Sequence, residues 1–170
     1  DTHEDRAARR RLLAAVASQS MEFREHQVEY GQPYRSAAIV DDGTPPPAAL
    51  DDIRLYVPGT HPGSPLPHAE VDDLDGNRQP LLDLVGADEL LLIAGEAGTA
   101  WCEAAERLAA NAGVKLRAVR IGHMEGDYRD PRCTWLHHRQ ITPEGAVLVR
   151  PDRFVAWRSL GAGADPSREL

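Results

Sequence analysis

One stretch, from Glu89 to Ile121, constrains the fold of this chain more than any other part of its sequence. It opens with a continuous apolar run, Glu89–Gly95 (ELLLIAG), which is bounded by turn residues and predicts a buried central strand. Residues 99–112 then have a helical composition with Gly113 just past their end, and Val114–Ile121 (VKLRAVRI) alternates like a second strand. A strand, a crossover helix and a strand in this order form a parallel pair with a right-handed connection. The stretch therefore predicts an α/β fold.

Shorter segments on both sides extend this unit into a mixed sheet. Ala69–Leu74 has the pattern of a strand, and Pro80–Gly86 that of a short helical turn or loop. Cys133–Arg139 predicts a short helix, and Gly145–Arg158 (GAVLVRPDRFVAWR) predicts a hairpin around Pro151-Asp152. The order β, β, α, β, short α, β-hairpin is typical of a thioredoxin-like domain, in which helices flank a mixed sheet.

The region before this domain has a different pattern. Residues 4–30 contain neither Gly nor Pro and predict one long helix, which either lies on its own domain or remains from a preceding, missing domain. Ser36–Val40 is a short strand candidate, and Asp41–Asp52 (DDGTPPPAALDD) predicts an extended connector because its prolines lack backbone donors. We expect three parts: residues 1–50 as N-terminal helix and Pro-rich connector, 51–162 as the thioredoxin-like domain, and 163–170 as a flexible tail.

Charge and hydropathy argue against two classes of partner. The net charge of −8 disfavours nucleic acid and anionic membrane surfaces, because both attract a basic face. The longest apolar run, near Leu90–Ala94, is far shorter than the roughly 20 residues that cross a bilayer. We therefore expect neither nucleic acid nor a membrane as a partner. Because the chain begins at Asp1 and not at Met, we also expect it to be a piece of something longer.

The two cysteines, Cys102 and Cys133, are too few for a disulfide framework. The sequence has no Cys-x-x-Cys motif and no familiar zinc spacing, so we expect free thiols, no metal, and a reducing, cytoplasmic setting. Among the histidines, the adjacent pair His137-His138 is a poor metal site because neighbouring helical residues point about 100° apart. His61 and His123 have the setting of loop residues.

Cys102, near the start of the predicted helix, leaves two interpretations open. The first turn of a helix lowers the pKa of a thiol, which would suit a stand-alone thioredoxin-like thiol peroxidase or transferase. However, the residues one turn away, Thr99 and Ala105, supply no resolving thiol. Cys102 also borders the apolar stripe of the helix, where a free cysteine is usually an inert core residue. We favour the inert thiol, keep the thiol enzyme as the alternative, and retain a free-standing interaction module as a third hypothesis.

Three motifs point to a known family: Gly145–Arg158, Pro62–His68 (PGSPLPH), and Glu29–Val40 (EYGQPYRSAAIV) with the DGTPPP that follows it. Together they resemble the C-terminal part of FAD-dependent aromatic hydroxylases of the phenol hydroxylase group, which includes the dichlorophenol and polyketide hydroxylases. The sequence departs from the family pattern at Pro65, where an arginine is usual, and at Glu70, where a tryptophan is frequent. If that arginine helps to dock the domain in relatives, docking differs in this chain.

The resemblance implies a longer parent enzyme that uses FAD, NAD(P)H and O₂ to hydroxylate phenol-like rings. In such enzymes the preceding domains build most of the flavin site, so it also implies a missing N-terminal flavin domain and no cofactor bound to this chain alone. The residues agree, since no G-x-G-x-x-G follows a strand, and Gly95–Gly98 (GEAG) lacks the spacing of a P-loop. The chain would then be a non-catalytic C-terminal domain that supports the flavin domain, with a homodimer as a candidate assembly.

The candidate docking residues are His68, Arg150, Asp152, Trp157 and Arg158. Arg and Trp are favoured interface anchors, so Arg150 and Trp157 would suit a contact with the flavin domain or with a second subunit. The plainer alternative is a turn that carries a local Asp–Arg pair of little energetic weight. His68 lies in the Pro-Gly…Pro-His motif, where we expect it to fix the crossing chain by a hydrogen bond.

Overall fold

The structure is a computed structural model that describes residues 2–19, 23–48, 51 and 53–170. It divides into two compact units, which are named here by their content. The N-terminal unit comprises residues 1–32 and 48–57, and the sheet unit comprises residues 33–47 and 58–170. The chain therefore crosses between the units three times along its sequence.

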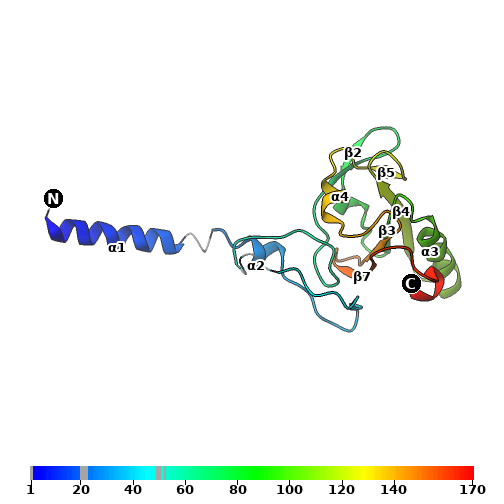
Figure 1. Cartoon of the computed structure of the whole chain (residues 1–170), viewed down its shortest axis with the longest axis horizontal. Coiled ribbons are helices and arrows are strands. Elements are labelled where there is room, and N and C mark those ends of the chain that lie inside the picture. The colour runs from blue at the N-terminus through cyan, green and yellow to red at the C-terminus, as the bar shows by residue number, and fades with distance from the viewer. Residues whose placement is uncertain (1, 20–22, 49–50, 52) are drawn as a thin grey trace. The chain divides into compact units, whose positions relative to one another are not determined.

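The sheet unit is built on one seven-stranded sheet in the order β2-β1-β5-β4-β3-β6-β7 (Figure 1). Its strands are β1 (Glu70–Asp72), β2 (Arg78–Pro80), β3 (Leu90–Gly95), β4 (Leu116–Gly122), β5 (Tyr128–Arg129), β6 (Ala146–Val149) and β7 (Val155–Ser159). The pairs β3–β4 and β4–β5 are parallel, and the remaining pairs are antiparallel. The predicted mixed α/β sheet, with a parallel β3–β4 pair and a closing hairpin, is confirmed.

Strand β3 is the centre of the core, because successive side chains point to opposite faces of a sheet and both faces are covered. On one face, Leu91 and Ile93 pack with residues of η1 (Leu81–Leu84) and α4 (Thr134–His138). On the other face, Leu92 and Ala94 pack with α3 (Thr99–Ala112), beside which lies α5 (Pro166–Glu169) (Figure 1). Gly98 precedes α3, and a Cβ there would lie 2.8 Å from that of Ala94, so the glycine permits close approach of the helix to the sheet.

Two short strands and one turn differ from expectation. The strands β2 and β5, of three and two residues, were not predicted, because neither has an alternating apolar pattern. They are defined by their pairing with β1 and β4. The predicted strand Ser36–Val40 is wrong: Ile39 N donates to Ser36 O in a turn, and only Val40 N reaches the sheet, at Ala156 O. The apolar residues of this segment therefore belong to a turn on the surface of the sheet unit.

Residues 33–47, called the connector strap below, belong to the sheet unit. Tyr34 N donates to Gly63 O at 2.7 Å, and Val40 N donates to Ala156 O at 2.8 Å. This division differs from the boundary that we expected near residue 50, because these long-range bonds join the connector to the sheet. The predicted flexibility of the tail, residues 163–170, stays a prediction, while the structure places α5 in that tail, next to α3.

The N-terminal unit contains α1 (His3–Gln19) and α2 (His26–Tyr30). The prediction of one continuous helix over residues 4–30 is wrong, because residues 23–25 are not helical; residues 20–22 lie outside the described residues. Gln27 N donates to Ile53 O at 3.1 Å, which joins α2 to the second segment of the unit. Neither helix has a buried residue. Among the described residues, no helix combines the length and apolar character needed to span a bilayer.

Candidate functional site

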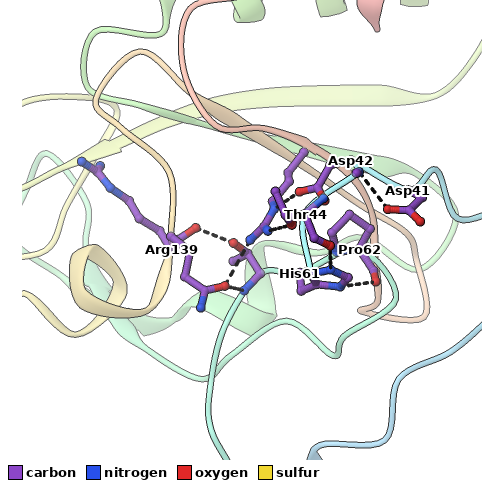
Figure 2. Close-up of polar contacts among 10 residues, drawn as sticks. Asp41, Asp42, Thr44, His61, Pro62 and Arg139 are labelled. Carbon is purple, nitrogen blue, oxygen red and sulfur yellow. Dashed lines mark hydrogen bonds and ion pairs between the residues drawn. The ribbon is translucent and has the colours of Figure 1, made fainter. Parts of the chain in front are cut away.

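A cluster of polar side chains lies where the connector strap meets β7. The Arg158 guanidinium and the Asp42 carboxylate form an ion pair with Nε 2.5 Å from Oδ2, and each side chain is only 6% exposed. The same guanidinium donates to Thr44 Oγ1 at 2.8 Å and to Gln140 Oε1 at 3.1 Å. Figure 2 shows Asp42 and Thr44 facing this cluster. The arrangement therefore holds the strap to the last strand of the sheet.

The polar chain continues from Gln140 to the turn after β3. Gln140 Oε1 accepts from Thr60 N at 3.0 Å, and the buried Thr60 hydroxyl donates to the carbonyl of Arg139. The Arg139 side chain, also buried and seen in Figure 2, donates to Glu96 Oε2 at 2.6 Å. Because Gln140 adopts a left-handed backbone conformation, with φ of 50°, its amide is aimed back at this cluster. One network of hydrogen bonds thus extends from the strap to Glu96.

Two carboxyl groups in this network have perturbed pKa values. Burial alone would raise the pKa of the Asp42 carboxyl, but hydrogen bonds from Thr44 and Arg158 outweigh it and leave the pKa below its usual value. The Glu96 carboxyl behaves alike: burial raises its pKa, but the Arg139 guanidinium and a hydrogen bond from the Glu96 backbone together lower the pKa below its usual value. Both groups are therefore ionised at neutral pH and paired with a cation.

His61 is a loop residue, as expected, and its side chain joins the same cluster. Its Nε2 lies 3.1 Å from Thr44 O and its Nδ1 lies 3.0 Å from Pro62 O, as Figure 2 shows. The five residues Asp42, Thr44, His61, Gln140 and Arg158 are called the connector latch below. The sequence singled out only Arg158. Its partner Asp42 could have been noticed from the D-x-T pattern of residues 42–44, which is typical of a turn held by an aspartate side chain. In the structure, Asp42 Oδ1 accepts from both the amide and the hydroxyl of Thr44.

The predicted docking residues divide into three groups. The expected local pair is present, since Arg150 Nη2 lies 2.7 Å from Asp152 Oδ2, and the same guanidinium stacks 5.1 Å from the centre of the Tyr34 ring. His68 is exposed, and no described residue hydrogen-bonds to its side chain. Arg158 is buried against the strap of its own chain, so its guanidinium is not free for a partner.

Arg150 and Trp157 meet in a shallow, mainly apolar groove of about 490 Å³. The groove is bordered by Val40 of the strap, Leu148 of β6 and Leu170 next to α5. The Trp157 ring also packs edge-on against Trp101 of α3, with ring centres 5.1 Å apart. Of the five predicted docking residues, the structure thus brings Arg150 together with Asp152 in an ion pair and with Trp157 in this groove.

The geometry of Cys102 opposes a redox role. The residue lies in the first turn of α3, half-buried beside the core of that face. Burial, together with the nearby Asp127 carboxylate, raises the pKa of its thiol to about 11. At neutral pH the sulfur is therefore a thiol and not the reactive thiolate, which weighs against the alternative of a thiol enzyme.

The other candidate ligands are dispersed. Cys133 is a free, exposed cysteine whose Sγ lies 3.3 Å from His123 Nδ1. The rings of His137 and His138 lie edge to face with centres 5.6 Å apart. Within residues 2–19, 23–48, 51 and 53–170, no group of three or more His, Cys, Asp or Glu side chains is arranged to hold a metal ion.

The turn before α3 does not fit a dinucleotide phosphate. Three of its four amides are bonded to backbone carbonyls: Gly95 N donates to Gly145 O, Ala97 N to Pro143 O and Gly98 N to Gly95 O, each at 2.9 Å. A Cβ on Gly95 would lie 2.3 Å from Pro143 O, so no space is open beside that residue. Phosphate-binding turns instead present free amides, so the residues present here do not fit FAD or NAD(P)H.

Comparison with known proteins gives a consistent assignment. Residues 59–170 match the family model described as aromatic-ring hydroxylase, C-terminal. The chain is 40% identical over 164 residues to a 2,4-dichlorophenol 6-monooxygenase of Delftia acidovorans, covering 94% of this chain and 27% of that protein. It is 37% identical over 167 residues to a phenol 2-monooxygenase of Pseudomonas sp. (strain EST1001), covering 96% of this chain and again 27% of the relative.

Solved structures agree with these matches. The flavin-dependent monooxygenase PieE, in complex with FAD and substrate, is similar over 100% of this chain and 29% of its own, with a TM-score of 0.87 and 40% identity. Aklavinone-11 hydroxylase, in a ternary complex with FAD and aklavinone, is similar over 81% of this chain with a TM-score of 0.66 and 37% identity. The chain therefore spans about a quarter of the length of the relatives that it matches.

Proposed function

The chain belongs to the family of aromatic-ring hydroxylase C-terminal domains, and from this premise we propose that it is the non-catalytic C-terminal part of an FAD-dependent monooxygenase. The parent enzyme hydroxylates phenol-like aromatic rings with NAD(P)H and O₂. FAD, when bound, supplies the oxygen chemistry from an N-terminal flavin domain outside this sequence. Within the parent enzyme, this chain supports that flavin domain. We place the protein in the cytoplasm, which its two free cysteines favour.

One observation carries this proposal: nearly the whole chain aligns with only about a quarter of each hydroxylase. The relatives are monooxygenases by name, and the similar solved structures carry FAD. The bonded amides of the turn before α3 also support a flavin site in another part of the enzyme.

Two exposed apolar regions support a docking role. Leu12, Leu13 and Val16 of α1 are all more than half exposed, and an isolated apolar stripe of this kind marks an interaction site. The groove at Arg150 and Trp157 is the second region. We assign both to the preceding part of the parent enzyme, because about three quarters of the relatives' length lies outside this chain. Contact with a second copy is the competing outcome.

The function is tested by comparing this chain with the complete product of its gene. We expect the complete protein to be yellow with FAD and to oxidise NAD(P)H faster when a phenol is added. The 170-residue chain should be colourless and inactive with peroxides and disulfides. Stoichiometric flavin on the short chain, or peroxide turnover that disappears in Cys102→Ser, would overturn the proposal. A gene product that begins close to residue 1 would favour a free-standing interaction module.

The docking role is tested by hydrogen exchange of α1 in the complete protein and in the short chain. We expect α1 to exchange more slowly in the complete protein, because its apolar stripe is then covered. Leu12→Ser should raise this exchange, whereas Leu74→Ser, at a residue about as exposed on the sheet unit, is the matched control. Equal exchange in both proteins would contradict the assignment, and protection that depends on chain concentration would assign the stripe to a second copy.

A further inference from the structure

The connector strap has a prepared seat on the sheet unit. Gly63, which accepts the hydrogen bond from Tyr34 N, has a φ of +89°, a conformation that glycine adopts freely. A Cβ at this position would lie 2.3 Å from Tyr34 O, so any larger residue would push the strap away. The strap therefore lies directly against the backbone of Gly63, and only glycine at this position leaves room for it.

Burial of apolar side chains does not explain why the strap stays in this seat. Most residues between Pro33 and Val40 are exposed, including Val40 at 55%. By contrast, the carboxylate of Asp42 and the guanidinium of Arg158 are almost fully buried, although 116 positions separate them in the sequence. A buried charge that loses its partner is strongly destabilising, so each of these groups requires the other in place.

We propose that the sheet unit carries a binding site whose ligand is the chain's own connector strap, and that the Asp42–Arg158 pair decides whether the strap is bound or released. The site recognises a carboxylate that is held in a turn, since Thr44 bonds both to Asp42 Oδ1 and to Arg158 Nη2. His61 closes the site from the other side at Thr44 O. The connector is therefore a bound segment of the sheet unit. This inference does not depend on the identity of the parent enzyme.

The test is hydrogen exchange of the full chain in Asp42→Asn, with Asp41→Asn as the matched control. Both variants remove one negative charge from adjacent residues, but Asp41 is exposed and accepts only from Gly43 N. We expect Asp42→Asn to raise exchange of the Tyr34 and Val40 amides, which bond to Gly63 O and Ala156 O, by about tenfold or more, as loss of a charge-assisted hydrogen bond implies. Asp41→Asn should change it by about twofold or less. Amides of β3 serve as the internal reference and should be unchanged in both.

Two results would overturn the proposal. One is equal strap exchange in the two variants, and the other is strap amides that exchange in the unaltered chain as fast as fully exposed ones. If Asp42→Asn also speeds β3, the whole unit has loosened, and Thr44→Val becomes the deciding variant. It keeps the carboxylate and removes the hydroxyl that bonds to Arg158. A rise confined to the strap supports the site, and no rise in Thr44→Val contradicts it.

Discussion

The two units of this chain place their apolar residues in opposite environments. In β3, Leu91, Leu92 and Ile93 are fully buried between two layers of helices. In α1, Leu12 is 64% exposed and no residue is buried. The sequence pattern predicts a strand for β3 and a helix for α1, and both form. However, only the apolar side chains of β3 are buried. The difference teaches that local propensity is enough to define a helix, whereas its burial depends on partners elsewhere.

What stabilises α1 in the absence of a core is local. Thr2 and Asp5 form a reciprocal cap, in which Asp5 N donates to Thr2 Oγ1 at 3.2 Å and Thr2 N donates to Asp5 Oδ2 at 2.8 Å. These hydrogen bonds lower the pKa of the exposed Asp5 carboxyl. The sheet unit instead relies on contacts between residues far apart in sequence, such as Asp42 with Arg158.

The sharpest test of the comparison applies one substitution to both units. Leu91→Ala should destabilise the chain by about 3 kcal/mol, because it leaves a cavity in a fully packed core. Leu12→Ala should change the free energy of unfolding by about 0.5 kcal/mol or less, because the side chain is already in water. Urea unfolding of both variants measures the difference, and similar effects at the two sites would break the comparison.

Cysteine labelling tests how tightly the α3 face of the sheet unit is packed. Burial raises the pKa of Cys102 to about 11 from an ordinary 9.0, so its thiolate fraction at pH 8 is about 100-fold below that of an ordinary thiol. We expect alkylation of the exposed Cys133 within minutes and of Cys102 only after unfolding, followed in Cys133→Ser and Cys102→Ser single-cysteine variants. Rapid labelling of native Cys102 would revive the thiol-enzyme alternative.

Acidification tests the largely buried ion pairs that the sheet unit forms between residues far apart in sequence. The folded-state pKa values of Asp42 and Glu96 lie below the ordinary 3.8 and 4.5, since hydrogen bonds outweigh the effect of burial. Their contribution to stability is therefore complete above those ordinary values and is lost as the pH falls through the lower, folded values. We expect a constant Tm from about pH 7 to 5 and a decline below about pH 4. The decline should be shallower in Asp42→Asn, and an unchanged decline would contradict the role of the latch.

The smallest expected effect concerns the cap of α1. Thr2→Ala removes the acceptor for Asp5 N and should cost about 1 kcal/mol of local helix stability. Circular dichroism should show less helix at an unchanged main unfolding transition. Thr99→Ala at the start of α3 is the control, because Gly98 is the N-cap there and no side chain caps that helix. A shift of the main transition in Thr2→Ala would mean that α1 and the sheet unfold together.

Sequence reasoning identified the elements whose signal is local. The apolar run of β3, the helix α3 with Gly113 in a left-handed conformation after it, and the β6–β7 hairpin all lie where their patterns placed them. It missed β2 and β5, since strands of two or three residues are defined by the neighbours that they pair with. It also missed the interruption of the N-terminal helix before α2, where the residues have good helical propensity.

The candidate site was harder to predict for the same reason. Arg158 was singled out as a docking residue, but its partner lies in the connector, and no local pattern links the two positions. His61 likewise meets Thr44 of the strap 17 positions away, and Thr60 bonds to Gln140 across 80 positions. The local ion pair of Arg150 and Asp152 was foreseen, because residues two positions apart in a turn are already close.

The three sequence crossings between the units also limit how related enzymes can be recombined. A chimera joined at residue 59, where the family match begins, would take Asp42 from one parent and Arg158 from the other. A splice at residue 33 would inherit the strap and its seat together, along with residues 48–57 that belong to the other unit. We therefore expect chimeras joined at residue 33 to fold better than chimeras joined at residue 59, although residue 59 is where the family match begins.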